Sequence, residues 1–186
     1  MSLEELADNE KTDKNTVHAY LPLYQSLLEG KKDTAKNVLE IGIKNGGSIK
    51  LWSDFFTNAT VYAIDIQKDI PPQLLNNEKI VLYMSTNAYD EEIFKNIFLN
   101  NNIKYDFILD DGPHTLDSMI KFIKLYSQII TDDGILIIED VQSWDWIDKL
   151  KDAVPEDLKK YIKTYDLRNK KNRWDDIVFT IDKQSN

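Results

Sequence analysis

Two short apolar stretches of this chain each end in a pair of acidic residues, within residues 107–111 and 135–140. Unbroken apolar runs of this length, rich in branched side chains, are typical of buried parallel strands. The carboxyl ends of such strands form the crevice in which open α/β sheets bind ligands. A histidine, His114, follows the first acidic pair. The pattern therefore predicts an α/β sheet with four carboxylates and one imidazole gathered at one edge.

A glycine-containing turn lies upstream of these runs. Residues 37–42 have the composition of a strand that runs into this turn, and a helix is expected from about Ile49. A second strand, residues 61–65, ends in Asp65, at the interval where nucleotide-type folds hold a ribose by its hydroxyls. Strand, glycine turn, helix, strand and acid together make one βαβ unit.

Strands and helices alternate along the rest of the chain. Further strands are predicted at residues 79–84, 161–165 and 176–181, and helices at residues 16–28, 90–98, 115–130 and around 144–150. The last two strands read as an antiparallel hairpin that closes one edge. We therefore expect a Rossmann-like, doubly wound sheet of seven mostly parallel strands with an antiparallel C-terminal hairpin.

Composition restricts the class of protein. The 186 residues suit a single domain, 1–186, with loosely held ends at 1–11 and 183–186. A formal net charge of −9 and a pI near 4.7 argue against an extended nucleic-acid partner. No apolar run has the length of a membrane span and the start does not resemble a signal peptide, so a cytoplasmic location is expected. The chain has no cysteine, so any metal must be held by oxygen or imidazole ligands.

Several motifs together resemble one family. The turn from Glu40 to Gly46 is similar to the E/D-x-G-x-G-x-G turn of methyltransferases, with Lys44 in place of the middle glycine. The further motifs, in chain order, are Thr12-Asp13-Lys14, His18-x-Tyr20, Asp110–His114, Glu139-Asp140, Asp166-Leu167-Arg168 and Arg173-x-Asp175-Asp176. Over residues 11–182 the chain resembles the metal-dependent sugar O-methyltransferases of the macrocin and mycinamicin type, which have the class I methyltransferase fold.

The resemblance implies S-adenosylmethionine as methyl donor and Mg²⁺, or another divalent cation, as metal. It implies metal binding by Asp111, Glu139 and Asp140, with His114 as catalytic base beside Asp111. The residues expected to bind or orient the donor are Glu40, Gly42, Gly46, Ser48, Asp65, Ile66, Asn87, Asp110 and Tyr20. The acceptor would be a hydroxyl of a sugar or of a glycosylated small molecule, and a homo-oligomer is one possible assembly.

Two other functions fit the same residues. A catechol-like aromatic diol needs the same ion and the same paired oxygens as two neighbouring sugar hydroxyls. A non-catalytic module that binds S-adenosylmethionine or a nucleotide sugar needs only the crevice, although retention of the acids and of His114 argues against it. Two residues also have alternative roles. Asp110 is suited to capping the strand end or the next helix, and His18 is suited either to packing or to covering the donor.

Overall fold

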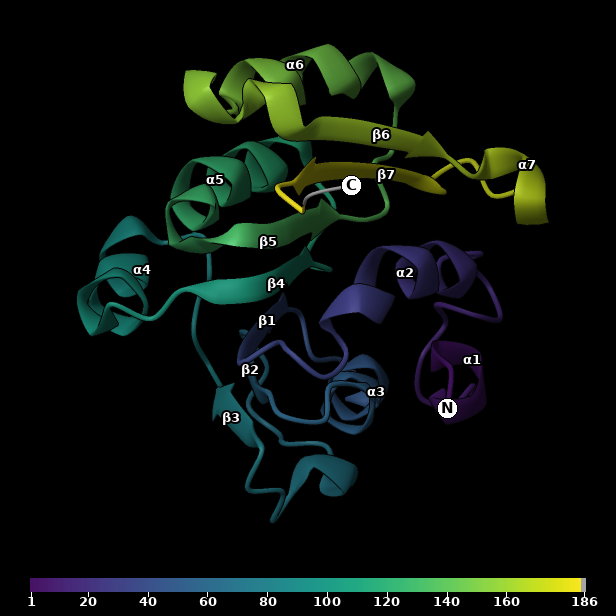
Figure 1. Ribbon diagram of the computed structural model, residues 1–186, viewed down its shortest axis with the longest axis vertical. Helices are drawn as coiled ribbons and strands as arrows, with labels where there is room; N and C mark the ends of the chain where they lie inside the picture. Colours follow the sequence, from purple (N-terminus) through teal and green to yellow (C-terminus); the bar gives the residue numbers. More distant parts are fainter. Residues whose placement is uncertain (185–186) are drawn as a thin grey trace.

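The computed structural model describes residues 1–184, which form a single seven-stranded sheet in the order β3-β2-β1-β4-β5-β7-β6 (Figure 1). The strands are β1 (Asn37–Ile41), β2 (Thr60–Ile64), β3 (Ile80–Tyr83), β4 (Tyr105–Asp110), β5 (Ile130–Ile138), β6 (Ile162–Asp166) and β7 (Ile177–Asp182). The first five strands pair in parallel, and β7 lies antiparallel to both β5 and β6. The seven strands, their mostly parallel pairing and the antiparallel C-terminal hairpin agree with the prediction.

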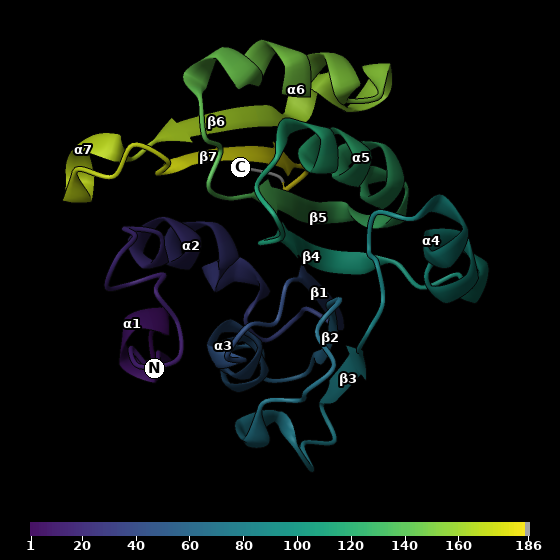
Figure 2. The same cartoon turned by 180° about the vertical axis from the view of Figure 1, so that it is seen from behind.

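Helices cover both faces of the sheet (Figures 1 and 2). They are α1 (Leu3–Leu6), α2 (Leu21–Leu28), α3 (Gly47–Phe55), α4 (Glu91–Ile97), α5 (Leu116–Tyr126), α6 (Ile147–Ala153) and α7 (Arg168–Lys171). One hydrophobic core joins the sheet to α4, α5 and α6, and a second joins it to α1, α2 and α3. Within β1, Leu39 belongs to the first core and Val38 to the second, since neighbouring side chains point to opposite faces. Burial on both faces explains why the central strands are apolar without alternation.

The N-terminal region differs from the sequence-based expectation in two ways. Residues 1–11 were expected to be loose, but Ser2 caps α1 and the side chain of Leu3 is fully buried. The helix expected over residues 16–28 begins only at Leu21, with a proline in its first turn. The preceding segment, Lys14 to Tyr20, is irregular and carries buried side chains that reach the acidic strand ends. Apolar spacing alone did not distinguish this packed irregular segment from a helix.

The predictions at the C-terminal side are mostly accurate. Helix α5 begins with a capping box at Thr115 and ends at Tyr126, a few residues earlier than expected. Strand β5 begins at Ile130, earlier than expected, with a register irregularity against β4. The backbone N–H of Lys183 donates to the Gly134 carbonyl, so residue 183 is paired, whereas residues 185–186 lie outside the described part of the chain. Among residues 1–184, every helix is too short or too polar to cross a bilayer.

Candidate active site

A crevice opens at the carboxyl ends of the parallel strands, where the sequence predicted a ligand site. It encloses about 770 Å³, which is in the range of cavities that bind cofactors and other small molecules. Its lining includes seven of the predicted site residues, namely Gly42, Asp65, Ile66, Asn87, Asp111, His114 and Asp140. One cavity therefore joins residues predicted to bind the donor with residues predicted to bind the metal.

The turn after β1 forms one wall of the crevice through its backbone. Gly42 has a φ of 98°, and a Cβ at this position would overlap the carbonyl oxygen of Asp111. Gly42 is therefore required both by its own backbone conformation and by the close approach of the loop after β4. Lys44, which occupies a glycine position of the family motif, has a φ of 49°. The substitution thus keeps a left-handed backbone that glycine adopts at lower cost.

Asp65, at the end of β2, holds the turn from the opposite side. Its Oδ2 accepts a hydrogen bond of 2.6 Å from the N–H of Ile43, and its Oδ1 accepts one of 2.9 Å from the N–H of Gln67. The carboxylate is thereby fixed at the mouth of the crevice. Asn87 also lines the crevice, and its Oδ1 accepts a hydrogen bond from the N–H of Tyr89.

Glu40 lies beneath the turn and does not line the crevice. It is fully buried, accepts a hydrogen bond of 2.7 Å from the Ser48 hydroxyl and accepts another from Trp52 Nε1. Burial raises the pKa of Glu40 to about 7. Gly46 is the left-handed residue that precedes α3. These contacts join β1 to the start of α3, which fixes the turn.

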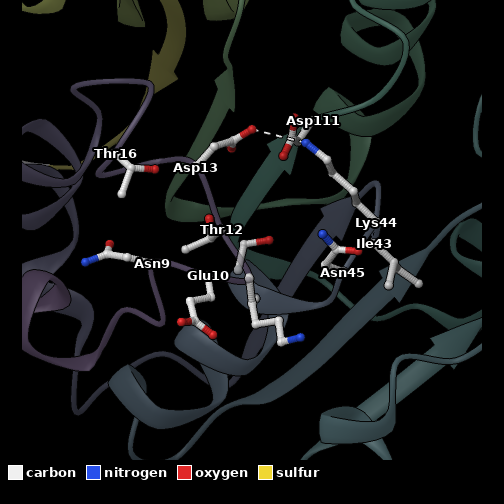
Figure 3. Close-up of a pocket in the computed structure, with 12 residues that line it drawn as sticks. Asn9, Glu10, Thr12, Asp13, Thr16, Ile43, Lys44, Asn45 and Asp111 are labelled. Carbon is white, nitrogen blue, oxygen red and sulfur yellow. Dashed lines mark hydrogen bonds and ion pairs between the residues drawn. The ribbon is translucent and has the colours of Figure 1, made fainter.

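The N-terminal segment forms a smaller pocket, of about 130 Å³, against the same turn (Figure 3). Asp13 pairs with Lys44, with Oδ2 and Nζ 3.1 Å apart. A Cβ on Gly47 would overlap the backbone at Lys11, so the segment lies directly on the first turn of α3. The sequence indicates this segment only through the family motif, because its position over the turn depends on contacts between residues distant in the chain.

On the other side of the crevice, side chains that follow β4 and β5 meet. His114 Nε2 lies 3.3 Å from Asp140 Oδ2 and 3.5 Å from Asp111 Oδ1. The three ligand-type atoms lie within 4.8 Å of one another, a spacing that can hold one cation. His114 and Asp140 both have a φ of 56°, in the left-handed region. A residue with a Cβ adopts this left-handed conformation only at a cost in free energy. Backbone strain of this kind is common at functional sites.

Glu139 is turned away from this group, although the sequence placed it there as a metal ligand. Its side chain is buried, and its Oε1 pairs with the ammonium of Lys14 while its Oε2 accepts a hydrogen bond from the Tyr24 hydroxyl. Lys14 Nζ also lies 2.7 Å from Asp111 Oδ2. The arrangement therefore divides the predicted metal ligands into Asp111 and Asp140, which face the crevice, and Glu139, which lies behind it.

Two residues predicted to bind the donor also lie behind the crevice. Asp110 is buried and accepts a hydrogen bond from the Tyr89 hydroxyl, and burial raises the pKa of Asp110 to about 7. Tyr20 is fully buried and donates to Asp140 Oδ1. Strand alternation explains why Asp110 is buried while Asp111 lines the crevice, because the side chains of adjacent residues at the end of β4 point in different directions. The position of Tyr20 follows from the irregular segment before α2.

The chain termini supply a further buried group next to Asp140. His18 Nδ1 lies 2.6 Å from Asp176 Oδ1 and 3.4 Å from Asp140 Oδ1. Asp175 is also buried, and its Oδ2 pairs with Arg173 at 2.9 Å. The N-terminal motif around His18 and the C-terminal motif around Asp176 therefore lie next to Asp140, at the same end of the sheet as the central acidic motifs.

Comparison with known proteins yields distant relatives. No protein-family model matches the sequence. The chain is 24% identical over 148 residues to an 8-demethyl-8-alpha-L-rhamnosyl tetracenomycin-C 2'-O-methyltransferase of Streptomyces olivaceus, covering 76% of this chain and 38% of that protein. It is 25% identical over 154 residues to the mycinamicin VI 2''-O-methyltransferase of Micromonospora griseorubida, covering 77% and 37%. The chain thus spans less than two-fifths of the length of these curated relatives.

Solved structures share the fold. The chain matches a MycE methyltransferase from the mycinamycin biosynthetic pathway, in complex with Mg and SAH, with a TM-score of 0.77 and 20% identity over 99% of this chain and 55% of that chain. A MycE complex that also contains mycinamycin VI gives the same TM-score at 18% identity, with the same coverage. The class I methyltransferase fold predicted from the sequence is thereby confirmed.

Proposed function

We propose that this chain, a relative of the macrocin- and mycinamicin-type sugar O-methyltransferases, is a metal-dependent O-methyltransferase that uses S-adenosylmethionine. The acceptor would be a hydroxyl of a sugar or of a glycosylated small molecule. One observation carries the proposal: a single crevice contains Asp65 beside the glycine turn on one side and Asp111, His114 and Asp140 on the other. Methyl transfer to a hydroxyl needs a donor site and a site that activates the acceptor, side by side.

The donor half fits S-adenosylmethionine. The volume of about 770 Å³ is sufficient for a nucleoside with an amino-acid arm. Asp65 would accept hydrogen bonds from the ribose hydroxyls, and Asn87, which also lines the crevice, would offer its amide to the adenine. The smaller pocket between Asp13 and Ser48 would accommodate the amino-acid end, with Glu40 orienting the turn from below.

The acidic half fits a divalent cation. Asp111 Oδ1 and Asp140 Oδ2 both face His114 Nε2, and carboxylate oxygens are the ligands that Mg²⁺ prefers. A bound divalent ion lowers the pKa of a hydroxyl that it coordinates and fixes its direction. Both effects are needed because a sugar hydroxyl is a poor nucleophile at neutral pH.

His114 is the proposed base. Its imidazole is partly exposed to the crevice, and it can accept the proton that the acceptor hydroxyl loses as its oxygen bonds to the methyl carbon and the carbon–sulfur bond breaks. Asp111 and Asp140 flank the imidazole and would stabilise the imidazolium that results. The walls of the crevice would exclude bulk water from the methyl group.

The test is calorimetric titration with S-adenosylmethionine, with and without Mg²⁺. We expect donor binding in the native protein and in an Asp111→Ala, Asp140→Ala double variant, and Mg²⁺ binding in the native protein alone. Asp65→Asn should weaken donor binding by about 30-fold, because a charge-assisted hydrogen bond is worth roughly 2 kcal/mol. Failure of the native protein to bind the donor would overturn the proposal.

The acceptor class is tested separately by mass spectrometry of the products. Glycosylated small molecules and catechol-like diols are offered with donor and Mg²⁺ to the native protein and to a His114→Gln variant. Methylation of sugars that depends on His114 supports the proposal. Methylation of catechols alone would support the aromatic-diol alternative, and donor binding without transfer to any acceptor would support a non-catalytic module.

A further inference from the structure

Two tryptophans are the exposed aromatic residues of residues 1–184. The chain has 7 Phe, 9 Tyr and 4 Trp, and all of these are buried or half-buried except Trp144, which is 42% exposed, and Trp174, which is 57% exposed. An indole left in water forgoes a large apolar contact area, and its ring face can stack on a flat ligand. A pair of exposed indoles in one region of the surface therefore indicates a binding surface.

Both tryptophans belong to the edge of the sheet that carries the acidic side chains. Trp144 follows Asp140 by four residues, so their Cα atoms are at most about 14 Å apart. Trp174 lies two residues before Asp176, whose Oδ1 is 2.6 Å from Nδ1 of His18, beside Asp140. Neither tryptophan lines the donor crevice, so a ligand can contact both while the donor is bound.

A basic segment, residues 168–173, lies between the two tryptophans. It comprises α7 and the two residues after it, and α7 projects on the side to which the arrowheads of β4 and β5 point (Figures 1 and 2). The segment contains four cations and no acid, in a chain with a formal net charge of −9. Trp144, Trp174 and this segment together form a platform next to the acidic half of the crevice.

Arg168 fixes one indole of the platform. Its guanidinium lies over the Trp144 ring, 5.7 Å from the ring centroid. Hydrogen bonds of 2.8 Å and 2.7 Å from its Nε and Nη2 to the Asp166 carboxylate hold it in this place. Asp166 therefore balances the charge of Arg168, which acts as a positioning residue for Trp144.

Two lysines of the platform carry charge that no carboxylate balances. Lys171 Nζ donates to the carbonyl oxygens of Asn15 and, at 3.1 Å, of Thr16, which ties α7 to the N-terminal segment. Lys170 is exposed, and within residues 1–184 neither lysine forms an ion pair with a carboxylate. An apolar ligand would desolvate these charges at a cost, whereas an anionic ligand is attracted to them. The platform therefore favours a ligand that has both a flat ring and a negative charge.

We propose that the platform is an acceptor subsite for a nucleoside-diphosphate sugar. The indoles stack on the base, the basic segment binds the diphosphate, and the sugar extends past Asp140 so that one hydroxyl meets His114. This inference rests on the proposed methyltransferase function and narrows its acceptor to a sugar that is still attached to a nucleotide. A long nucleic acid is not favoured, because the rest of this acidic chain would repel it.

The first test measures nucleotide-sugar binding while the donor crevice is filled. The native protein, saturated with S-adenosylhomocysteine and Mg²⁺, is titrated with UDP-glucose, dTDP-glucose and GDP-mannose, and with glucose phosphate and methyl glucoside for comparison. We expect at least one nucleotide sugar to bind about tenfold more tightly than glucose phosphate, because its base stacks on an indole, and to quench tryptophan fluorescence. Methyl glucoside, which lacks both base and charge, should bind most weakly.

The second test changes the exposed indole. Trp174→Ala should weaken nucleotide-sugar binding by about tenfold, whereas Trp174→Phe should weaken it by less than about threefold, because a phenyl ring still stacks. Leu75→Ala is the control, since Leu75 is also an exposed apolar residue, 52% exposed, outside the platform. Equal affinity of the native protein and Trp174→Ala would overturn the proposal.

The third test removes the unbalanced charges. A Lys170→Gln, Lys171→Gln double variant should bind the nucleotide sugar about tenfold more weakly, and its affinity should depend less on salt concentration. The matched control is Lys159→Gln, Lys160→Gln, which removes two adjacent exposed lysines that precede β6, at the end of that strand away from α7. The control should keep the native affinity, and an equal loss in both double variants would contradict a specific diphosphate contact.

Methyl transfer gives a separate readout. With the nucleotide sugar as acceptor, Trp174→Ala should raise KM by about tenfold and change kcat by less than about threefold, because the platform binds the part of the acceptor that does not react. Mass spectrometry identifies the methylated product. Equal KM values for methyl glucoside and for the nucleotide sugar would overturn the proposal.

The outcomes separate this inference from the proposed function. Failure of the native protein to bind S-adenosylhomocysteine would contradict the methyltransferase function itself. Binding of S-adenosylhomocysteine without binding of any nucleotide sugar would overturn only the role of the platform. A native dimer that Trp174→Ala converts to a monomer in size-exclusion chromatography would also overturn it, because a second copy of this chain would then cover the indoles.

Discussion

The two halves of the crevice are built in different ways. The donor half consists mainly of backbone: a strand end, a left-handed turn at Gly42 and Lys44, and a carboxylate, Asp65, bound by N–H groups. The acidic half consists of buried and half-buried side chains, and its acids are held by a distant segment, from Lys14 to Tyr24. A backbone site depends on local conformation, whereas a site of buried charges depends on every partner being present. The two halves should therefore respond differently to substitution.

The largest effect is expected at the acidic half. Asp111→Asn should lower the rate of methyl transfer by about a thousandfold, because it removes one of the proposed metal ligands, worth several kcal/mol. Donor affinity should change by less than about threefold, since the donor half is separate. Steady-state rates and calorimetry measure the two effects. The control is Asp148→Asn, which changes an exposed acid on α6, away from the crevice. A large loss of donor affinity in Asp111→Asn would contradict the separation of the two halves.

The next effect tests the contact between the halves. Gly42→Ala should reduce the free energy of unfolding by about 3 kcal/mol, because a Cβ overlaps the Asp111 carbonyl and the backbone is left-handed. Gly30→Ala is the control, since a Cβ there meets nothing within 4 Å, and it should be neutral or slightly stabilising. Urea unfolding measures both. Equal stability of the two variants would show that the halves are not in rigid contact.

A pH effect is expected behind the crevice. Because burial raises the pKa of Asp110 to about 7, the folded protein binds a proton there more tightly than the unfolded chain does. Stability should therefore fall as the pH rises from about 4 to 7, with Asp110 contributing roughly 2 kcal/mol between pH 5 and 7.5. Asp110→Asn should reduce this slope in urea unfolding, measured without metal, and Asp117→Asn should retain it. An unchanged slope in Asp110→Asn would contradict the assignment.

The smallest effect is expected at the donor turn. Lys44→Gly should raise the free energy of unfolding by about 0.5 kcal/mol, because relief of the left-handed backbone slightly exceeds the entropy cost of glycine. Asn102→Gly is the control, since asparagine tolerates its φ of 55° better than lysine does. Thermal unfolding measures both variants. A lower midpoint for Lys44→Gly would indicate that the exposed ion pair with Asp13 contributes more than the strain.

The sequence predicted the fold and most of the crevice because both depend on local patterns. Apolar runs that end in Asp111 and Asp140, and a glycine turn followed by Asp65, place these residues at strand ends once the sheet is parallel. Glu139 was grouped with its neighbour Asp140 for the same reason. Adjacent residues at a strand end point in different directions, so the prediction located both acids correctly but could not tell which one faces the crevice.

The amino-acid sequence by itself determined the succession of strands and helices along the chain, the glycine turn and the identity of the acids, since these follow from periodicity and backbone preference over short stretches. Only the tertiary structure decided which oxygens remain available. Lys14, Tyr20 and Tyr24 approach the acids from a segment about a hundred residues away in the chain, as their hydrogen bonds show. The physical reason is that a buried charge takes whichever partner packing brings within hydrogen-bond distance, and packing is a property of the whole fold.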